Sequence, residues 1–128
     1  MKKILLVDDH RNIRTVMRLA LRDFFEIEEA ETSDAAWECI QQARPDGIIL
    51  DVLMPGALNG FQLCERIKCD NALADMHVVL VTACGQVADQ EMGRALGADG
   101  YFVKPFSPRA LAGHLLIALT THSGREAA

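Results

Sequence analysis

Short, continuous apolar runs alternate along this chain with longer segments in which apolar residues recur at helical spacing. A strand buried on both faces forms such a run, whereas a helix that covers a sheet carries an apolar stripe with a period near 3.6 residues. The runs cover residues 4–7, 48–52, 78–81 and 101–103, and a weaker run with three glutamates covers 25–30. This alternation predicts an α/β fold, a parallel sheet of about five strands with helices on both faces.

The segments between the runs carry start and stop signals for helices. Ser33 and Asn59 are candidate N-caps, and Ser107 followed by Pro108 is a strong helix start. Gly97 suits a left-handed C-terminal cap. The expected helices span residues 13–24, 33–43, 60–67, 87–96 and 108–119. We expect one domain over residues 1–120, followed by a flexible, polar tail at 121–128.

Composition excludes several classes of protein. Half of the 128 residues are apolar and the net charge is −5, as in a soluble globular chain without a basic face for nucleic acid. The apolar runs are too short to cross a membrane or to act as a signal peptide. Four cysteines without metal-ligand spacing are expected to be reduced thiols. We therefore expect a cytoplasmic protein that contacts neither nucleic acid nor membrane.

Polar side chains follow the predicted strands at their carboxyl ends. Asp8 and Asp9 end the first run, Asp51 the third, Thr82 the fourth and Lys104 the fifth. Each alone is commonplace, since an aspartate after a strand is usually a turn or cap residue. In a doubly wound sheet, however, these ends meet at one crevice. Clustered carboxylates favour Mg²⁺, and an aspartate beside an ammonium and a hydroxyl can accept a phosphoryl group.

Four motifs carry a resemblance to a known family. Residues 7–9 read Val-Asp-Asp, 50–55 read Leu-Asp-x-x-Met-Pro, 81–83 read Val-Thr-Ala and 104–106 read Lys-Pro-Phe. Together they resemble the receiver domain of two-component response regulators, from about Lys2 to about Leu119. The resemblance implies a flavodoxin-like, five-stranded parallel sheet with strand order 2-1-3-4-5. The segment from Met54 to Gly60 departs from the family pattern, because it is one residue longer.

The resemblance also implies roles for the residues at the strand ends. Asp51 would be the phosphoacceptor. Mg²⁺ would be held by Asp8, Asp9, Asp51 and the backbone carbonyl of Leu53, with Asp9 the more direct ligand. His10 follows the acid pair, but beside an oxygen-ligand magnesium site we expect it to be solvated.

Three further residues would respond to the phosphoryl group. Lys104 would bind it, Thr82 would be the switch hydroxyl, and Tyr101 would be the aromatic side chain that swings inward. Leu53 and Cys84 should flank the group, and because neither holds a water well we expect the phosphorylated state to reset slowly.

The resulting hypothesis is a phosphorylation-dependent signalling switch rather than a turnover enzyme. Its phosphodonor would be a sensor histidine kinase or a phosphotransfer protein. The leucine and isoleucine residues of 111–119 spread too widely for one buried stripe, so some of them should be exposed. These would form a contact patch for a partner, or for a homodimer through the last strand and helix. Two alternatives are a degenerate receiver that only docks partners and a Mg²⁺-dependent phosphatase using an aspartyl phosphate. The phosphatase pattern has two alternating aspartates and a cap domain, and this chain has an adjacent pair and no room for a cap.

Overall fold

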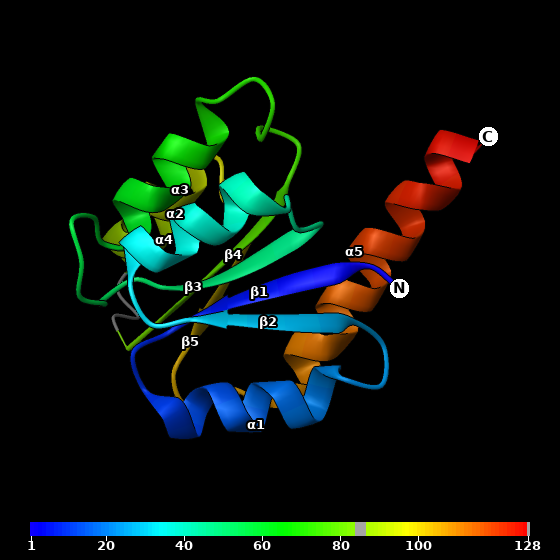
Figure 1. Cartoon of the computed structure of the whole chain (residues 1–128), viewed down its shortest axis with the longest axis horizontal. Helices are drawn as coiled ribbons and strands as arrows, with labels where there is room; N and C mark the ends of the chain where they lie inside the picture. Colours follow the sequence, from blue (N-terminus) through cyan, green and yellow to red (C-terminus); the bar gives the residue numbers. More distant parts are fainter. Residues whose placement is uncertain (84–86, 128) are drawn as a thin grey trace.

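Five parallel strands form one sheet in the order β2-β1-β3-β4-β5 (Figure 1). The computed structural model describes residues 1–83 and 87–127, with side chains to residue 119. The elements are β1 (Lys3–Val7), α1 (Arg11–Leu21), β2 (Glu26–Ala30), α2 (Ser33–Gln42), β3 (Gly47–Asp51), α3 (Gly60–Lys68), β4 (His77–Thr82), α4 (Val87–Ala95), β5 (Gly100–Val103) and α5 (Pro108–Ala127). The predicted flavodoxin-like fold and strand order are confirmed.

Helices cover both faces of the sheet. In Figure 1, α1 and α5 lie on one side and α2, α3 and α4 on the other. Successive strand residues point to opposite faces, so Leu5 packs toward α2 and α3 while Ile4 and Leu6 pack toward α1 and α5. The three central strands are therefore buried on both faces, which explains why they read as unbroken apolar runs.

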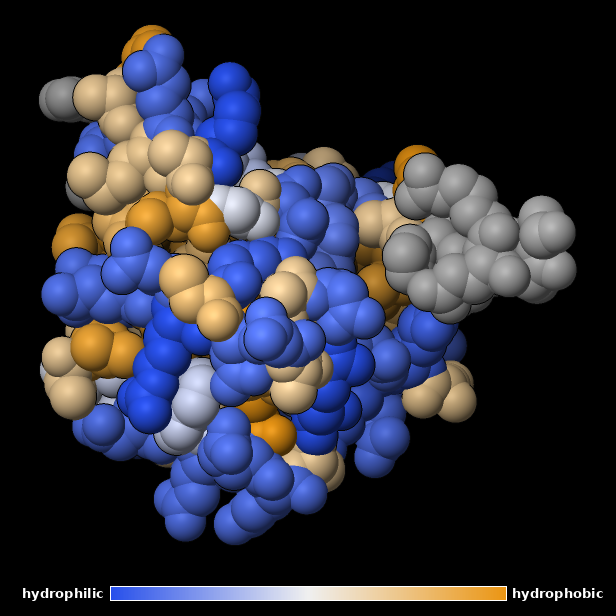
Figure 2. Space-filling view, turned by 90° about the horizontal axis from the view of Figure 1, so that it is seen from above, coloured by the Kyte–Doolittle hydropathy of each residue, from blue (hydrophilic) through white to orange (hydrophobic). Residues whose placement is uncertain are grey.

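The surface on the side of α2 and α3 is mostly hydrophilic. Figure 2 looks onto that side, and the hydrophobic areas among its coloured residues are small and separate. No helix in the described part of the chain is long and apolar enough to cross a membrane.

Helix α1 begins and ends earlier than the predicted span of 13–24, since it runs from Arg11 to Leu21. Its buried residues are Arg14, Met17 and Leu21, whereas Val16 and Phe24 are half exposed. Phe24 lies beyond the helix, in the turn to β2. Apolar residues on the flank of a helix fit the same spacing as those on its inner face, so spacing alone does not predict that Val16 and Phe24 are exposed.

Thr32, rather than Ser33, is the N-cap of α2, and its side chain accepts a hydrogen bond from Ala35 N. Ser33 instead accepts a hydrogen bond from Leu58 N, in the loop before α3. The predicted cap at Asn59 is confirmed, with Gln62 completing a reciprocal capping box.

Helix α5 continues to Ala127, past the predicted end near Leu119 and through the predicted tail. Three leucines form its buried stripe, Leu111, Leu115 and Leu119, and Leu116 is partly buried. Ile117 is 69% exposed. The predicted contact patch therefore reduces to Ile117, since the leucines are used to cover the sheet.

Candidate functional site

The carboxyl edge of the sheet brings together two buried aspartates and one lysine. Asp8 follows β1, Asp51 ends β3, and Lys104 follows β5. The Lys104 ammonium lies 3.2 Å from Asp8 Oδ2 and 3.3 Å from Asp51 Oδ2. Both carboxylates are almost fully buried. A single cation therefore bridges two carboxylates from different strands, as the strand-end prediction required.

Asp51 is held tightly by its own backbone surroundings. Leu53 N donates a hydrogen bond of 3.2 Å to Asp51 Oδ1. The first residue of α3 is Gly60, and a Cβ there would lie only 2.4 Å from the Asp51 carbonyl oxygen. Glycine is thus required for α3 to pack so close to the end of β3.

The charges of Asp8, Asp51 and Lys104 together favour a bound cation. Burial and the neighbouring Asp8 raise the pKa of Asp51, while Lys104 opposes them. Burial alone would lower the pKa of Lys104, but Asp51 and Asp8 outweigh it and raise that pKa. One ammonium facing two carboxylates leaves the pocket with a deficit of positive charge, which a divalent cation would neutralise.

Asp8, Asp9, His10 and Asp51 form a cluster whose candidate ligand atoms all lie within 4.8 Å of one another. The carboxylate oxygens fit the preference of Mg²⁺ for one or two carboxylates plus water and phosphate oxygens. His10 is mostly exposed, as expected of a solvated side chain. Its Nδ1 nonetheless lies 3.1 Å from Asp8 Oδ1 and 3.2 Å from Asp9 Oδ1.

The two predicted switch residues lie on neighbouring strands. Thr82 is fully buried at the end of β4, and its backbone carbonyl accepts a hydrogen bond of 2.8 Å from Lys104 N. Tyr101 is half-buried on β5, facing α4. A Cβ at Gly93 of α4 would lie 3.1 Å from the Tyr101 ring, so the helix and the ring are in close contact.

Leu53 lies at the rim of the site and is 61% exposed. Together with Asp9 and Asn59 it lines an open hollow of about 400 Å³. Cys84, the other predicted lifetime residue, lies outside the described residues.

The longer loop after Asp51 folds back onto the start of α2. Gly56 has φ +120°, a conformation that favours glycine. Ala57 N donates to the Asp34 carboxylate at 3.3 Å, and Leu58 N donates to Ser33 Oγ at 3.0 Å. The added residue is thus absorbed away from Asp51.

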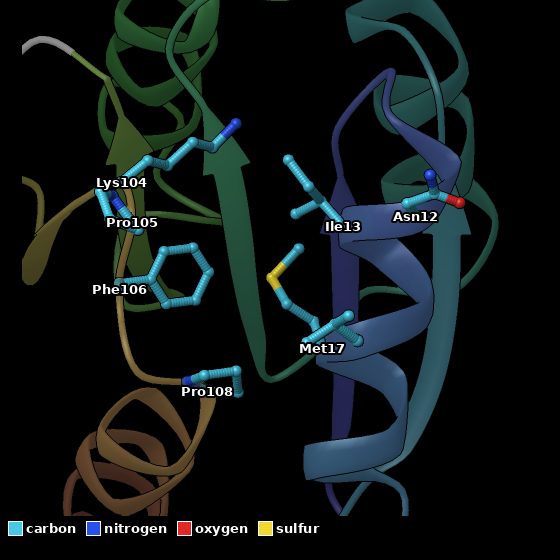
Figure 3. Close-up of a pocket in the computed structure, with 8 residues that line it drawn as sticks. Asn12, Ile13, Met17, Lys104, Pro105, Phe106 and Pro108 are labelled. Carbon is cyan, nitrogen blue, oxygen red and sulfur yellow. The ribbon is translucent and has the colours of Figure 1, made fainter.

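An apolar groove of about 450 Å³ runs beside Lys104, between α1 and the β5–α5 loop (Figure 3). In the close-up, Ile13 and Met17 project from α1 toward Phe106 on the opposite wall. Val16, half exposed, also lines it. The groove places accessible apolar surface directly next to the candidate phosphoryl site.

Arg14 is a site-associated residue that the sequence analysis missed. It is only 5% exposed, and its guanidinium donates a hydrogen bond of 2.6 Å to the backbone carbonyl of Asp8. Its position one residue after Ile13, on the inner side of α1, was the available signal. That signal is weak, because arginines on amphipathic helices are usually exposed.

Comparison with known proteins identifies the family. The sequence model of the response regulator receiver domain matches residues 4–116. A probable transcriptional regulator of Guillardia theta is 40% identical over 112 residues, 86% of this chain and 42% of that protein. The phosphate regulon regulatory protein PhoB of Pseudomonas aeruginosa is 39% identical over 119 residues, 92% of this chain and 52% of PhoB. The chain thus spans about half the length of these relatives.

Solved structures agree with the sequence relatives. The chemotaxis protein CheY4 of Vibrio cholerae superimposes with a TM-score of 0.82 at 34% identity, covering 90% of this chain and 96% of CheY4. The BeF3-activated DrrB receiver domain superimposes with a TM-score of 0.86 at 27% identity, covering 94% of this chain and 98% of that domain. The chain therefore belongs to the receiver domain family of two-component response regulators.

Proposed function

We propose that this chain is a phosphoacceptor switch in which Asp51 takes a phosphoryl group from a phosphohistidine. The donor would be a sensor histidine kinase or a phosphotransfer protein. The observation that supports this best is the Lys104 ammonium, which contacts both buried carboxylates, Asp8 and Asp51, at the end of the central strands. Mg²⁺ would be held by Asp8, Asp9, Asp51 and the backbone carbonyl of Leu53.

The transfer needs a nucleophile and neutralised phosphoryl oxygens. A carboxylate oxygen of Asp51 bonds to phosphorus as the bond to the donor histidine nitrogen breaks, and that nitrogen keeps the electron pair. Bound Mg²⁺ would supply positive charge to the phosphoryl oxygens. Lys104 favours the ionised form of Asp51 and then shifts toward a phosphoryl oxygen, and the Thr82 hydroxyl donates a hydrogen bond to another.

The signal would leave the site through β4 and β5. Movement of Thr82 toward the phosphoryl group changes the packing between the two strands and α4, and Tyr101 moves inward in response. The close contact between Tyr101 and Gly93 makes α4 sensitive to that movement. A phosphorylation-dependent homodimer would then form through the last strand and helix, where Ile117 is exposed.

The kinase would dock where it can reach Asp51. The apolar groove beside Lys104 lies at the same edge of the sheet, so a helix seated in it would bring its phosphohistidine toward the site. The longer relatives are named regulators of transcription, which supports control of transcription as the class of output. A cytoplasmic location and the absence of turnover catalysis are part of the same proposal.

Incubation with Mg²⁺ and acetyl phosphate, followed by intact-mass measurement, tests this function. The wild type should gain the mass of one phosphoryl group, and Asp51→Asn should gain none. Asp23→Asn, which removes an exposed carboxylate outside the site, is the matched control and should behave as wild type. Sustained phosphate release would favour the phosphatase alternative, and no mass gain would favour the docking receiver.

A further inference from the structure

Arg14 is the one arginine buried in the described part of the chain, and every part of its guanidinium has an acceptor. Nε donates to Glu29 at 2.9 Å, one terminal nitrogen donates to the Asp8 carbonyl at 2.6 Å, and the other donates to Glu31 at 3.3 Å. A buried charge is costly unless it is paired and hydrogen-bonded. Here the pairing joins α1 to the ends of both β1 and β2.

The contact with Asp8 reaches the backbone from which the acid pair projects. Asp8 N donates to Ala30 O at 3.2 Å, and the Asp8 carboxylate accepts from His10 N at 2.8 Å. Arg14 adds the bond to the carbonyl, so the peptide group between Asp8 and Asp9 is fixed from the side of α1. The orientation of that peptide sets ψ of Asp8 and φ of Asp9, and so contributes to where both carboxylates point.

Arg18 provides a comparison within the same helix. Its Nε also binds Glu29, at 2.7 Å, but its side chain is 44% exposed and no bond to Asp8 is found among the described residues. The two arginines therefore share a carboxylate partner and differ in the contact with the backbone of the acid pair.

We propose that Arg14 is a positioning residue for the metal site, which fixes the Asp8–Asp9 backbone so that both carboxylates are arranged for Mg²⁺ before the ion binds. This inference rests on the proposed function, because it takes the acid pair as the magnesium ligands. Removing a group that holds a metal ligand in place commonly lowers metal affinity by roughly ten- to a hundredfold.

The sign of the effect separates positioning from simple charge. The charge of Arg14 repels Mg²⁺, so by Coulomb's law alone its removal would strengthen the binding of Mg²⁺ to the nearby carboxylates. Loss of positioning would weaken it instead. If Arg14 only neutralised Glu29 and Glu31, lysine would restore its role, because lysine keeps the charge. Lysine lacks the planar fork that reaches Asp8 and Glu29 together, so it would not restore a positioning role.

Calorimetric titration with Mg²⁺ tests the proposal without any phosphoryl transfer. Arg14→Gln should weaken Mg²⁺ binding roughly tenfold, while Arg18→Gln should stay within about twofold of wild type. Arg14→Lys should fold, as checked by circular dichroism, and should still bind Mg²⁺ more weakly than wild type. It also serves as the test variant if Arg14→Gln does not fold. In the Arg14 variants, phosphorylation by acetyl phosphate should reach half of its maximum rate at a higher Mg²⁺ concentration than in wild type. The maximum rate itself should be unchanged.

Unchanged or tighter Mg²⁺ binding in Arg14→Lys and Arg14→Gln would overturn the proposal, and so would an equal loss in Arg18→Gln. The proposed function fails separately, if wild-type protein binds Mg²⁺ but Asp51 accepts no phosphoryl group.

Discussion

His77 Nε2 lies 2.9 Å from His114 Nε2, so a hydrogen bond between two imidazoles joins the start of β4 to α5. One ring must donate and the other accept, which requires that at least one be neutral. The His114 ring also lies edge-on to the Phe102 ring and close to Gly100, where a Cβ would lie 2.9 Å from His114 Nε2. The charged groups nearby are Asp99, 4.0 Å from His77 Nδ1, and Lys68, which binds Asp99.

This pair should make stability depend on pH. Burial lowers the pKa of His114, against the attraction of Asp99, so the unfolded chain takes up a proton at a higher pH than the folded chain. The contribution is complete above the ordinary histidine pKa of about 6.5 and is lost as pH falls below it. The free energy of unfolding, measured with urea near pH 7.5 and near pH 5.5, should fall less between the two pH values for His114→Gln than for wild type. An equal loss in wild type and in His114→Gln would refute this role.

Replacing Asp51 by asparagine should stabilise the fold. Burial and Asp8 raise the pKa of Asp51, so the folded protein disfavours the ionised carboxylate that function requires. The neutral amide relieves this at nearly the same shape, and Lys104 keeps Asp8 as its partner. We expect a gain of about 1 kcal/mol in the free energy of unfolding at neutral pH without Mg²⁺.

Denaturant unfolding with and without Mg²⁺ measures that gain. The advantage of Asp51→Asn should shrink when Mg²⁺ is added, because the ion stabilises the wild type through binding to the folded state. A variant less stable than wild type in the absence of Mg²⁺ would show that the Lys104–Asp51 pair outweighs the cost of burial.

The sheet and most of the site could be predicted because their causes are local in the sequence. Unbroken apolar runs report burial on both faces, and the residue after each run must lie at the carboxyl edge. Asp8, Thr82 and Lys104 follow their runs directly, and Asp51 follows three apolar residues at the end of β3. The cap at Asn59 and the left-handed turn at Gly97, with φ +94°, are likewise set by neighbouring residues.

What escaped prediction depends on contacts between distant segments. Arg14 is buried only because β2 brings Glu29 and Glu31 beside α1, and nothing in the pattern of α1 shows that. The His77–His114 pair joins residues 37 positions apart, across β4 and α5. The apolar spread of α5 predicts that some of its side chains are exposed, but helical spacing alone does not tell which ones, and in the structure it is Ile117.

Ile117 should contribute to self-association if the proposed dimer forms through α5. Sedimentation with beryllofluoride should show a dimer for wild type and a monomer for Ile117→Asp, because a buried charge at an apolar contact is strongly unfavourable. Leu19→Asp is the matched control, since Leu19 is 55% exposed on α1 and lies outside the proposed contact. A wild type that stays monomeric at high concentration would leave Ile117 as a contact for a different partner only.

The lifetime of the phosphorylated state should depend on the side chain at Leu53. An acyl phosphate is lost when a water attacks in line, and a polar side chain that orients this water speeds the loss. Leu53 lies beside Asp9 at the open rim of the site and offers no hydrogen bond from its side chain. Phosphate release from the Leu53→Asn, Cys84→Glu double variant should be at least roughly tenfold faster than from wild type. The single variant Leu53→Ala removes bulk without adding a polar group, so it separates water orientation from simple shielding. Release from the double variant no faster than from wild type would show that these two side chains do not set the lifetime.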